Sequence, residues 1–158
     1  MPEEAGVVFE LMCDAARWLA DKKVNQWANL NNDGFRKFLD WRVANLWAYL
    51  IDHGGNSIAT ICLQPSDPNT WGETGDDGSA GYVHGLAIAT SAHGLGIGRS
   101  LLKWAEQRFA NAGRRLIRLD CIAENSRLCR YYSDLGYTEV VRATAGPHRT
   151  RLFEKAIL

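Results

Sequence analysis

The sequence predicts one mixed α/β domain that spans residues 1–158. Segments with apolar residues at helical spacing and segments rich in β-forming residues both occur along the chain, which is typical of this class. A chain of 158 residues can bury a sizeable core and suits a single domain. We find no internal repeat, low-complexity tract or interdomain linker that would divide it.

Two helices are expected at the start of the chain. The first has Pro2 and acidic residues 3–4 at its beginning, where the helix dipole favours negative charge. Its apolar side chains recur at helical spacing, at Val8, Leu11, Met12, Ala15 and Leu19. A second helix is predicted for residues 33–41, with an apolar side made of Phe35, Phe38 and Leu39.

A strand hairpin and a long loop follow. Residues 46–51 and 57–63 are rich in β-formers, and the turn signal His53-Gly54-Gly55-Asn56 separates them. Residues 65–79 are dense in Pro, Asp, Asn, Gly and Thr, so we expect a loop there. It is long for a compact domain, and such loops often act as lids or binding loops.

The second half of the chain alternates between strands and helices around several glycines. The helix expected at 99–111 has one apolar side and stops at Ala112-Gly113, as helices commonly do. In order, the expected elements are a strand at 82–88, a glycine-rich turn, the helix at 99–111, a strand at 116–122, a short helix at 126–135 closed by Gly136, and strands at 137–143 and 151–156 around a Gly146-Pro147 turn.

Composition excludes several classes of function. Lys plus Arg equals Asp plus Glu at 18 each, so no global field attracts nucleic acid or an anionic membrane. No basic leader precedes an apolar run and no window approaches a membrane span, so we expect a cytoplasmic protein. The four cysteines lack zinc-ligand spacing, which predicts no metal and favours buried thiols in a reducing compartment.

A glycine-rich turn before the 99–111 helix is the strongest chemical signal. Gly94, Gly96 and Gly98 alternate where a strand passes into a helix N-terminus, whose unpaired backbone amides and dipole favour an anion. The P-loop is excluded because Arg99-Ser100 follows the last glycine, and the dinucleotide fingerprint lacks its third glycine. Taken alone, the turn is a weak signal, and an ordinary tight turn remains an alternative.

Two sequence blocks together resemble the GNAT superfamily of N-acetyltransferases. The segment 85–102 resembles its central motif Arg/Gln-x-x-Gly-x-Gly/Ala, with Gly96 and Gly98 at the last two glycines. The segment 125–137 resembles a block in which an asparagine is followed seven positions later by tyrosine and then by Gly-Tyr, here Asn125, Tyr132 and residues 136–137. The blocks come in the family's order with one strand between them, and the resemblance covers roughly residues 82–140.

The resemblance implies the acyl-CoA N-acyltransferase fold, a central mixed, mostly antiparallel twisted sheet flanked by about four helices. The family's usual short strand before the first helix is not evident, so it is either absent or precedes the numbering. His93 stands where the motif usually has Arg or Gln, which weakens side-chain contact with phosphate but leaves the backbone amides.

The resemblance also implies acetyl-CoA as co-substrate and a primary amine on a small molecule, peptide or protein as acceptor, in a monomer or homodimer. The strand before the turn would pair with the pantetheine arm through Leu86, Ala87 and Ile88. The pyrophosphate would meet the amides of His93, Gly94, Leu95, Gly96, Ile97, Gly98 and Arg99. Asn125 would hydrogen-bond the cofactor.

The resemblance assigns Tyr132 to protonation of the departing thiolate. A phenol of pKa about 10 can return a proton to a thiolate whose pKa is about 8.5. Tyr132 can also be a core-facing aromatic, and Tyr131 is a rival that falls one position short. For the base we favour Asp120, which interrupts an apolar strand, while His84 or water alone remain alternatives.

The acceptor is the least determined part of the site. The 65–79 loop offers an aromatic beside carboxylates for a cationic amine, at Trp71, Glu73, Asp76 and Asp77, although a solvated charged loop is the simpler interpretation. Other tryptophans are expected in the core or a groove wall, at Trp18, Trp27, Trp41 and Trp47. Competing hypotheses are a non-catalytic acyl-CoA-binding or sensing module and a nucleotide-binding protein unrelated to CoA.

Overall fold

The computed structural model describes residues 2–27, 30, 32–45, 47–140 and 150–157. Predictions that fall on residue 46, on 141–143 and on Gly146-Pro147 lie outside the described residues. The chain divides into two compact units. The first unit comprises residues 1–62 and 85–98, and the second comprises 63–84 and 99–158. That the chain is one domain stays a prediction.

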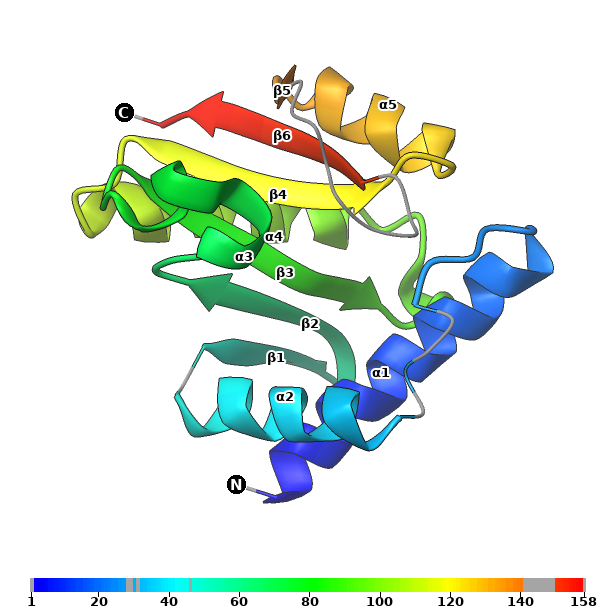
Figure 1. Cartoon of the computed structure of the whole chain (residues 1–158). Helices are drawn as coiled ribbons and strands as arrows, with labels where there is room; N and C mark the ends of the chain where they lie inside the picture. Colours follow the sequence, from blue (N-terminus) through cyan, green and yellow to red (C-terminus); the bar gives the residue numbers. More distant parts are fainter. Residues whose placement is uncertain (1, 28–29, 31, 46, 141–149, 158) are drawn as a thin grey trace. The chain divides into compact units, whose positions relative to one another are not determined.

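Two helices form the start of the first unit (Figure 1). Helix α1, Pro2–Asp21, confirms the predicted spacing, since its buried positions include Val8, Met12 and Ala15. Helix α2, Asp33–Ala44, begins after Asn32, whose side-chain oxygen accepts the Phe35 amide at 2.7 Å. It continues to Ala44 rather than ending at 41. The two helices bury a shared apolar cluster together with Ala87.

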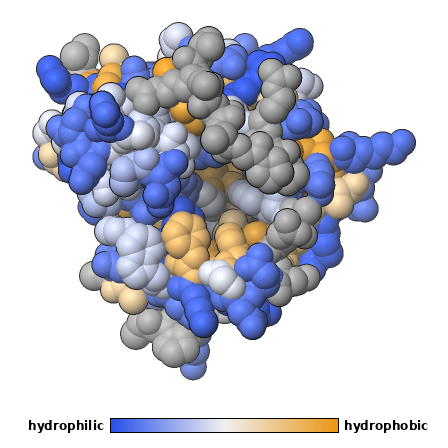
Figure 2. Space-filling view, in the orientation of Figure 1, coloured by the Kyte–Doolittle hydropathy of each residue, from blue (hydrophilic) through white to orange (hydrophobic). Residues whose placement is uncertain are grey.

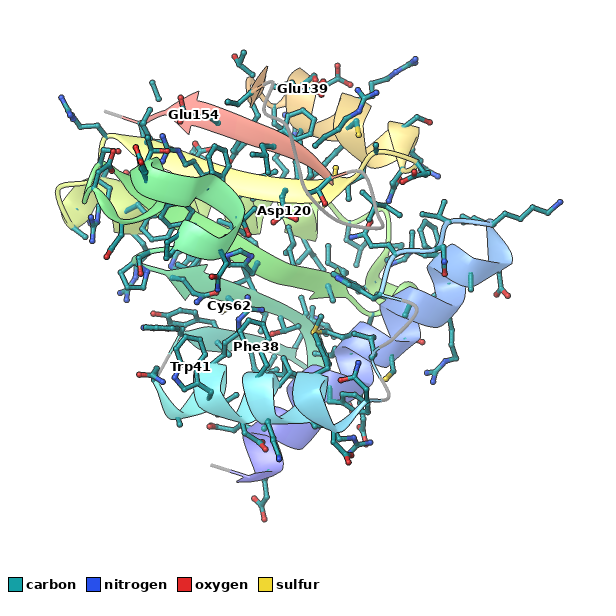
Figure 3. All side chains as sticks on the ribbon, in the orientation of Figure 1. Phe38, Trp41, Cys62, Asp120, Glu139 and Glu154 are labelled. Atoms are coloured by element: carbon teal, nitrogen blue, oxygen red, sulfur yellow. The ribbon has the colours of Figure 1, made fainter. Side chains whose placement is uncertain are left out.

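One side chain predicted for the apolar side of α2 instead meets solvent. Leu39 and Val43 are buried, but Phe38 lies one position off that stripe and is 39% exposed. Its ring stacks on that of Trp41, with the ring centroids 5.8 Å apart. The Arg42 guanidinium lies 4.0 Å from the centroid of the Phe38 ring. Figure 3 labels Phe38 and Trp41 beside α2, and Figure 2 shows hydrophobic side chains at the surface over this helix. Of the predicted apolar side of α2, Leu39 is therefore buried, whereas Phe38 is partly exposed.

The described strands form a six-stranded mixed sheet in the order β1-β2-β3-β4-β6-β5. Pairs β1/β2, β4/β6 and β5/β6 are antiparallel, and β3/β4 is parallel. This confirms the predicted mostly antiparallel sheet and its fold class. The bounds are β1 Ala48–His53, β2 Asn56–Gln64, β3 Ala80–Ile88, β4 Leu116–Ile122, β5 Thr138–Val140 and β6 Thr150–Ala156.

The predicted 65–79 loop is partly helical, so that expectation is wrong. Helix α3, Pro68–Trp71, begins after Asp67, whose side chain accepts the Thr70 amide, and a 3₁₀ helix covers Gly72–Asp76. An Asp-Pro pair at a helix start is a recognised signal, but four residues are too few to show a period. Trp71 is buried, with 1% of its surface exposed.

A buried arginine holds this helical segment against the core of the second unit. Arg118 donates from Nη1 to the Thr74 carbonyl at 2.8 Å and to the Tyr82 hydroxyl at 3.1 Å. Its Nε donates to Glu154 at 2.7 Å, and its guanidinium lies 4.6 Å from the Trp71 ring centroid. The charge of Arg118 is thus compensated while its plane covers an aromatic ring.

Two further helices follow the predicted pattern. Helix α4, Ile97–Asn111, starts two residues before the expected 99, and α5, Ser126–Asp134, ends one residue before the expected 135. All four cysteines are free thiols, and three of them are buried, at Cys62, Cys121 and Cys129. Among the described residues, none of the helices combines the length and apolar character needed to cross a bilayer.

Candidate active site

The glycine turn of the first unit is an exposed backbone loop between β3 and α4. Gly94 and Gly96 have φ angles of 81° and 74°, in the left-handed region that favours glycine. An added Cβ at either position would meet nothing within 4 Å, so the main chain is open on that side. Leu95 between them is 72% exposed. This geometry leaves backbone amides accessible to a ligand.

The N-terminus of α4 has main-chain features that favour an anion. The first amides of a helix have no intrahelical acceptor, and the dipole adds positive potential there. Those amides begin at Ile97. The His93 amide differs, because it donates to the Thr90 carbonyl at 3.3 Å. The part of the turn with free donor capacity therefore begins after His93.

The side chain of His93 is tied to the end of β3. Its Nε2–H donates to the Ile88 carbonyl at 3.0 Å, and its ring meets Trp18 of α1 edge-on at 4.7 Å. Asp14, also on α1, accepts both the amide and the hydroxyl of Thr90 at 2.9 Å. The Thr90 amide is the main reason that the pKa of Asp14 lies below its ordinary value. Sequence reasoning missed Asp14, which carries no motif.

The strand residues proposed for pantetheine lie directly before this turn. Ala87 is 2% exposed and joins the apolar cluster of α1 and α2, while Leu86 and Ile88 are half-buried. Gly85 precedes them with a φ of 56°, a conformation that breaks the regular pleat inside a strand. The strand is thus locally irregular where residues 86–88 begin.

The second unit brings three titratable side chains together. The His84 imidazole lies between two carboxylates, with Nε2 at 3.4 Å from Asp67 Oδ2 and Nδ1 at 3.7 Å from Asp120 Oδ1. The side chains of Asp67 and His84 are 10% and 13% exposed, whereas that of Asp120 is 31% exposed. Figure 3 marks Asp120 on β4. Both residues weighed as the base therefore belong to one cluster.

The strand register explains why His84 meets Asp120. In the parallel pair β3/β4, Val83 lies opposite Leu119, so the next residue on each strand is His84 and Asp120. Asp67 precedes α3 and was not singled out from the sequence. Burial opposes its ionisation, but the hydrogen bond and charge of His84, with the Thr70 bonds, hold the pKa of Asp67 below its ordinary value.

Tyr132 lies inside an aromatic cluster of the second unit. It is 6% exposed, and its ring centroid lies 5.5 Å from Phe153, 5.8 Å from Tyr131 and 6.0 Å from Tyr137. Burial, followed by the charges of Cys121 and Asp120, raises the pKa of Tyr132 well above its ordinary value. Its hydroxyl therefore keeps its proton at neutral pH.

The surroundings of Asn125 and Tyr131 are set by helix α5. Asn125 is 6% exposed and caps α5, because its Oδ1 accepts the Leu128 amide at 3.1 Å. Tyr131 is only half-buried; burial raises its pKa, and the nearby charge of Arg99 opposes that shift. Any contact of Asn125 with a cofactor stays a prediction.

The acidic loop is not the aromatic cation site suggested by its sequence. Trp71 is buried beneath the Arg118 guanidinium, so its ring is already covered by a cation of the protein itself. Within the described residues, no group of three or more His, Cys, Asp or Glu side chains is arranged to hold a metal ion.

Comparisons with known proteins agree with this arrangement. The profile of the Acetyltransferase (GNAT) family matches residues 10–137. YesJ of Bacillus subtilis (strain 168), an uncharacterized N-acetyltransferase, is 31% identical over 159 residues, which span 98% of this chain and 86% of YesJ.

Two solved structures share the fold. A GNAT-family acetyltransferase of Listeria monocytogenes has a TM-score of 0.80 at 21% identity, over 99% of this chain and 91% of that one. A GNAT-family acetyltransferase of Elizabethkingia anophelis, solved with acetyl-CoA bound, has a TM-score of 0.61 at 15% identity, over 81% and 87% of the two chains. The family profile and the relative YesJ cover most of the sequence, including both blocks singled out from it. This chain therefore belongs to the acetyltransferase (GNAT) family.

Proposed function

We propose that this protein transfers the acetyl group of acetyl-CoA to a primary amine of a small molecule or peptide. Membership of the GNAT family supports the reaction class. The observation that carries the choice of donor is the exposed glycine turn at the start of α4, which is built to receive an anion. The similar protein of E. anophelis has acetyl-CoA bound, which supports the same donor.

The residues of the turn fit the diphosphate of CoA. Gly94 and Gly96 leave open space beside the backbone, so phosphate oxygens have room to approach the amides of residues 95–99. Arg99 is exposed and adds a full positive charge. Further contacts in this proposal are the backbone of 86–88 with the pantetheine arm and Asn125 with the cofactor.

The chemistry requires one base and one acid. The acceptor ammonium loses a proton to Asp120, directly or through water, and the amine lone pair forms the C–N bond with the acetyl carbonyl carbon. When the C–S bond breaks, Tyr132 protonates the thiolate and regains a proton that the product nitrogen sheds. One proton in total passes to solvent. Because the pKa of Tyr132 is raised, its phenol is neutral and able to donate at the start of each turnover.

Release of free CoA thiol across a panel of amines tests this function. Small polyamines, amino acids, aminoglycosides and peptides with free N-termini or lysines are each supplied with acetyl-CoA. Thiol release that depends on one class of amine, with the acetylated amine seen by mass spectrometry, supports the proposal. Tight binding of acetyl-CoA without release for any amine would contradict it and indicate a non-catalytic acyl-CoA-binding module.

A further inference from the structure

The second unit contains a carboxylate that the proposed reaction does not yet use. Asp67 faces the side of His84 opposite Asp120, with Oδ2 at 3.4 Å from Nε2. Both of these atoms are buried, and neither has a hydrogen-bond partner in the part of the chain that the structure describes. A buried carboxylate and a buried imidazole nitrogen that have only each other form an oriented pair.

The position of Asp67 is set by its own backbone and by a cap. Its Oδ1 accepts the Thr70 amide at 3.2 Å, its amide donates to the Gly75 carbonyl at 2.8 Å, and its carbonyl accepts the Trp71 amide at 3.0 Å. At Gly75 an added Cβ would lie 2.4 Å from the Asp67 carbonyl oxygen, so the two segments touch. With Oδ1 committed to the cap, Oδ2 is the atom left for His84.

This arrangement selects one tautomer of His84. A neutral imidazole carries one N–H and one lone pair, and a carboxylate can only accept. The N–H is favoured on Nε2, toward the more buried carboxylate of Asp67, which leaves the lone pair of Nδ1 toward Asp120. The distance of 3.7 Å to Asp120 is longer than a hydrogen bond. A bridging water or a small closure on substrate binding completes such contacts.

We propose that Asp67 is a positioning residue that keeps the His84 proton on Nε2, so that Asp120 and the lone pair of Nδ1 accept the proton of the acceptor amine as one unit. This inference rests on the proposed acetyl transfer. The proton leaves the ammonium, passes to Asp120 and then to Nδ1, and the imidazolium so formed lies between two carboxylates. It returns to the neutral tautomer when Nδ1 releases that proton to solvent.

The charges around the pair come from several elements. Asp67 precedes α3, Asp120 and Arg118 lie on β4, Tyr82 lies on β3 and Tyr132 on α5. Arg118 is already paired with Glu154, so its charge is largely compensated. The charge of Asp67 also acts on Tyr82 and that of Asp120 on Tyr132. Titration of these described groups contributes to the pH profile.

Asp67→Asn tests the inference without enlarging the side chain. Asparagine also caps helices, so its Oδ1 keeps the Thr70 bond. Its Nδ2 donates toward Nε2, which moves the imidazole proton to Nδ1 and removes the lone pair that faces Asp120. Long-range ¹H–¹⁵N correlation spectra of the imidazoles report this directly, with the His84 signals assigned by their loss in His84→Gln.

Among the imidazole signals, only those of His84 are expected to differ between the variants. In the unmodified protein and in the control Asp134→Asn, an exposed carboxylate on α5, His84 carries its proton on Nε2. In Asp67→Asn the proton moves to Nδ1, while His93, which donates to Ile88, keeps its Nε2–H. An unchanged His84 tautomer in Asp67→Asn would overturn the inference, whatever the activity.

The dependence of kcat/KM on pH gives the second readout. In Asp67→Asn we expect a plateau at least about tenfold lower and an acid limb about one pH unit lower, because the charge that stabilises the protonated base is gone. A lower plateau with an unmoved limb would indicate support of the fold only and would overturn the inference. If Asp67→Asn fails to fold, the His84→Gln variant provides the test. With Asp120 as the sole base, the acid limb of kcat/KM should move below about pH 5. An acid limb in His84→Gln at the same pH as in the unmodified protein would overturn the inference.

The failure of this inference and of the proposed function are distinguishable. An unmodified protein that releases no thiol with any amine overturns the proposed function and the catalytic part of the inference together. An active protein whose acid limb and His84 tautomer are the same in Asp67→Asn overturns the inference alone.

Discussion

Replacing Tyr132 with phenylalanine removes only the hydroxyl that we propose as the proton donor to the CoA thiolate. The ring keeps its neighbours Tyr137 and Phe153, with centroids at 6.0 and 5.5 Å, so the free energy of unfolding should change by less than about 1 kcal/mol. A positioned proton donor contributes about 100- to 10,000-fold to a rate. We therefore expect kcat to fall at least about 100-fold, with the acetyl-CoA Kd changed by less than about twofold.

The pH dependence of this loss follows from the burial of the residue. Because burial raises the pKa of Tyr132 well above its ordinary value, the hydroxyl is protonated throughout the range from about pH 6 to 9. The ratio of unmodified to variant kcat should stay constant across that range. The assay measures the initial rate of thiol release with the amine found in the panel, and calorimetry measures the Kd.

Tyr131→Phe is the matched control, since it removes the same group from the next residue. Tyr131 is half-buried beside the charge of Arg99, and we expect its loss to change kcat by less than about threefold. A Tyr132→Phe variant that keeps full turnover would refute the acid role. Equal losses in the two variants would show that the hydroxyls act through the aromatic cluster instead.

Three further predictions concern single residues. Gly96→Ala should raise the acetyl-CoA Kd about tenfold because alanine resists a φ of 74°. The control Gly113→Ala, at a φ of 76°, should lower the free energy of unfolding by a similar amount, about 1 kcal/mol, and leave the acetyl-CoA Kd unchanged. Equal Kd values in the two variants would contradict this prediction. Burial raises the pKa of the Cys62 thiol from 9.0 to about 11, so the unfolded chain loses this proton at a lower pH than the folded chain and stability falls between about pH 9 and 11. In Cys62→Ala, the slope of unfolding free energy against pH in that range, measured by urea titration, should be shallower by about 1.4 kcal/mol per pH unit. An identical slope in both proteins would disprove this prediction. Asn32→Ala should cost about 1 kcal/mol because the Phe35 amide loses its cap, and Asn32→Asp should restore it in thermal unfolding.

The elements with a clear period or a clear turn could be predicted from sequence. Strand β4 has the predicted bounds, and α1 buries the predicted stripe except that Leu19 is only half-buried. Helix α3 could not be predicted from periodicity, since it has four residues and its Trp71 ring lies against Arg118 of a distant strand. The exposure of Phe38 could not be predicted, because an aromatic side chain beside an apolar stripe gives no local sign of its exposure.

The candidate site was only partly within reach of sequence reasoning. Asp120 and His84 were weighed as rival bases, and no sequence spacing indicates that they meet; the parallel register of β3 and β4 brings them together. Asp67 carries no motif, and only the tertiary structure reveals that its carboxylate faces His84. Trp71 looked available to a substrate because it lies among loop residues, yet a large apolar ring in a polar segment tends to be buried.

Amide hydrogen exchange with and without acetyl-CoA tests the central claim most directly. If main-chain donors at the start of α4 hold the CoA diphosphate, exchange at residues 95–100 slows on binding, while the His93 amide, already bonded to Thr90, changes little. Binding that leaves exchange at 95–100 unaltered and slows it in another segment would contradict the account.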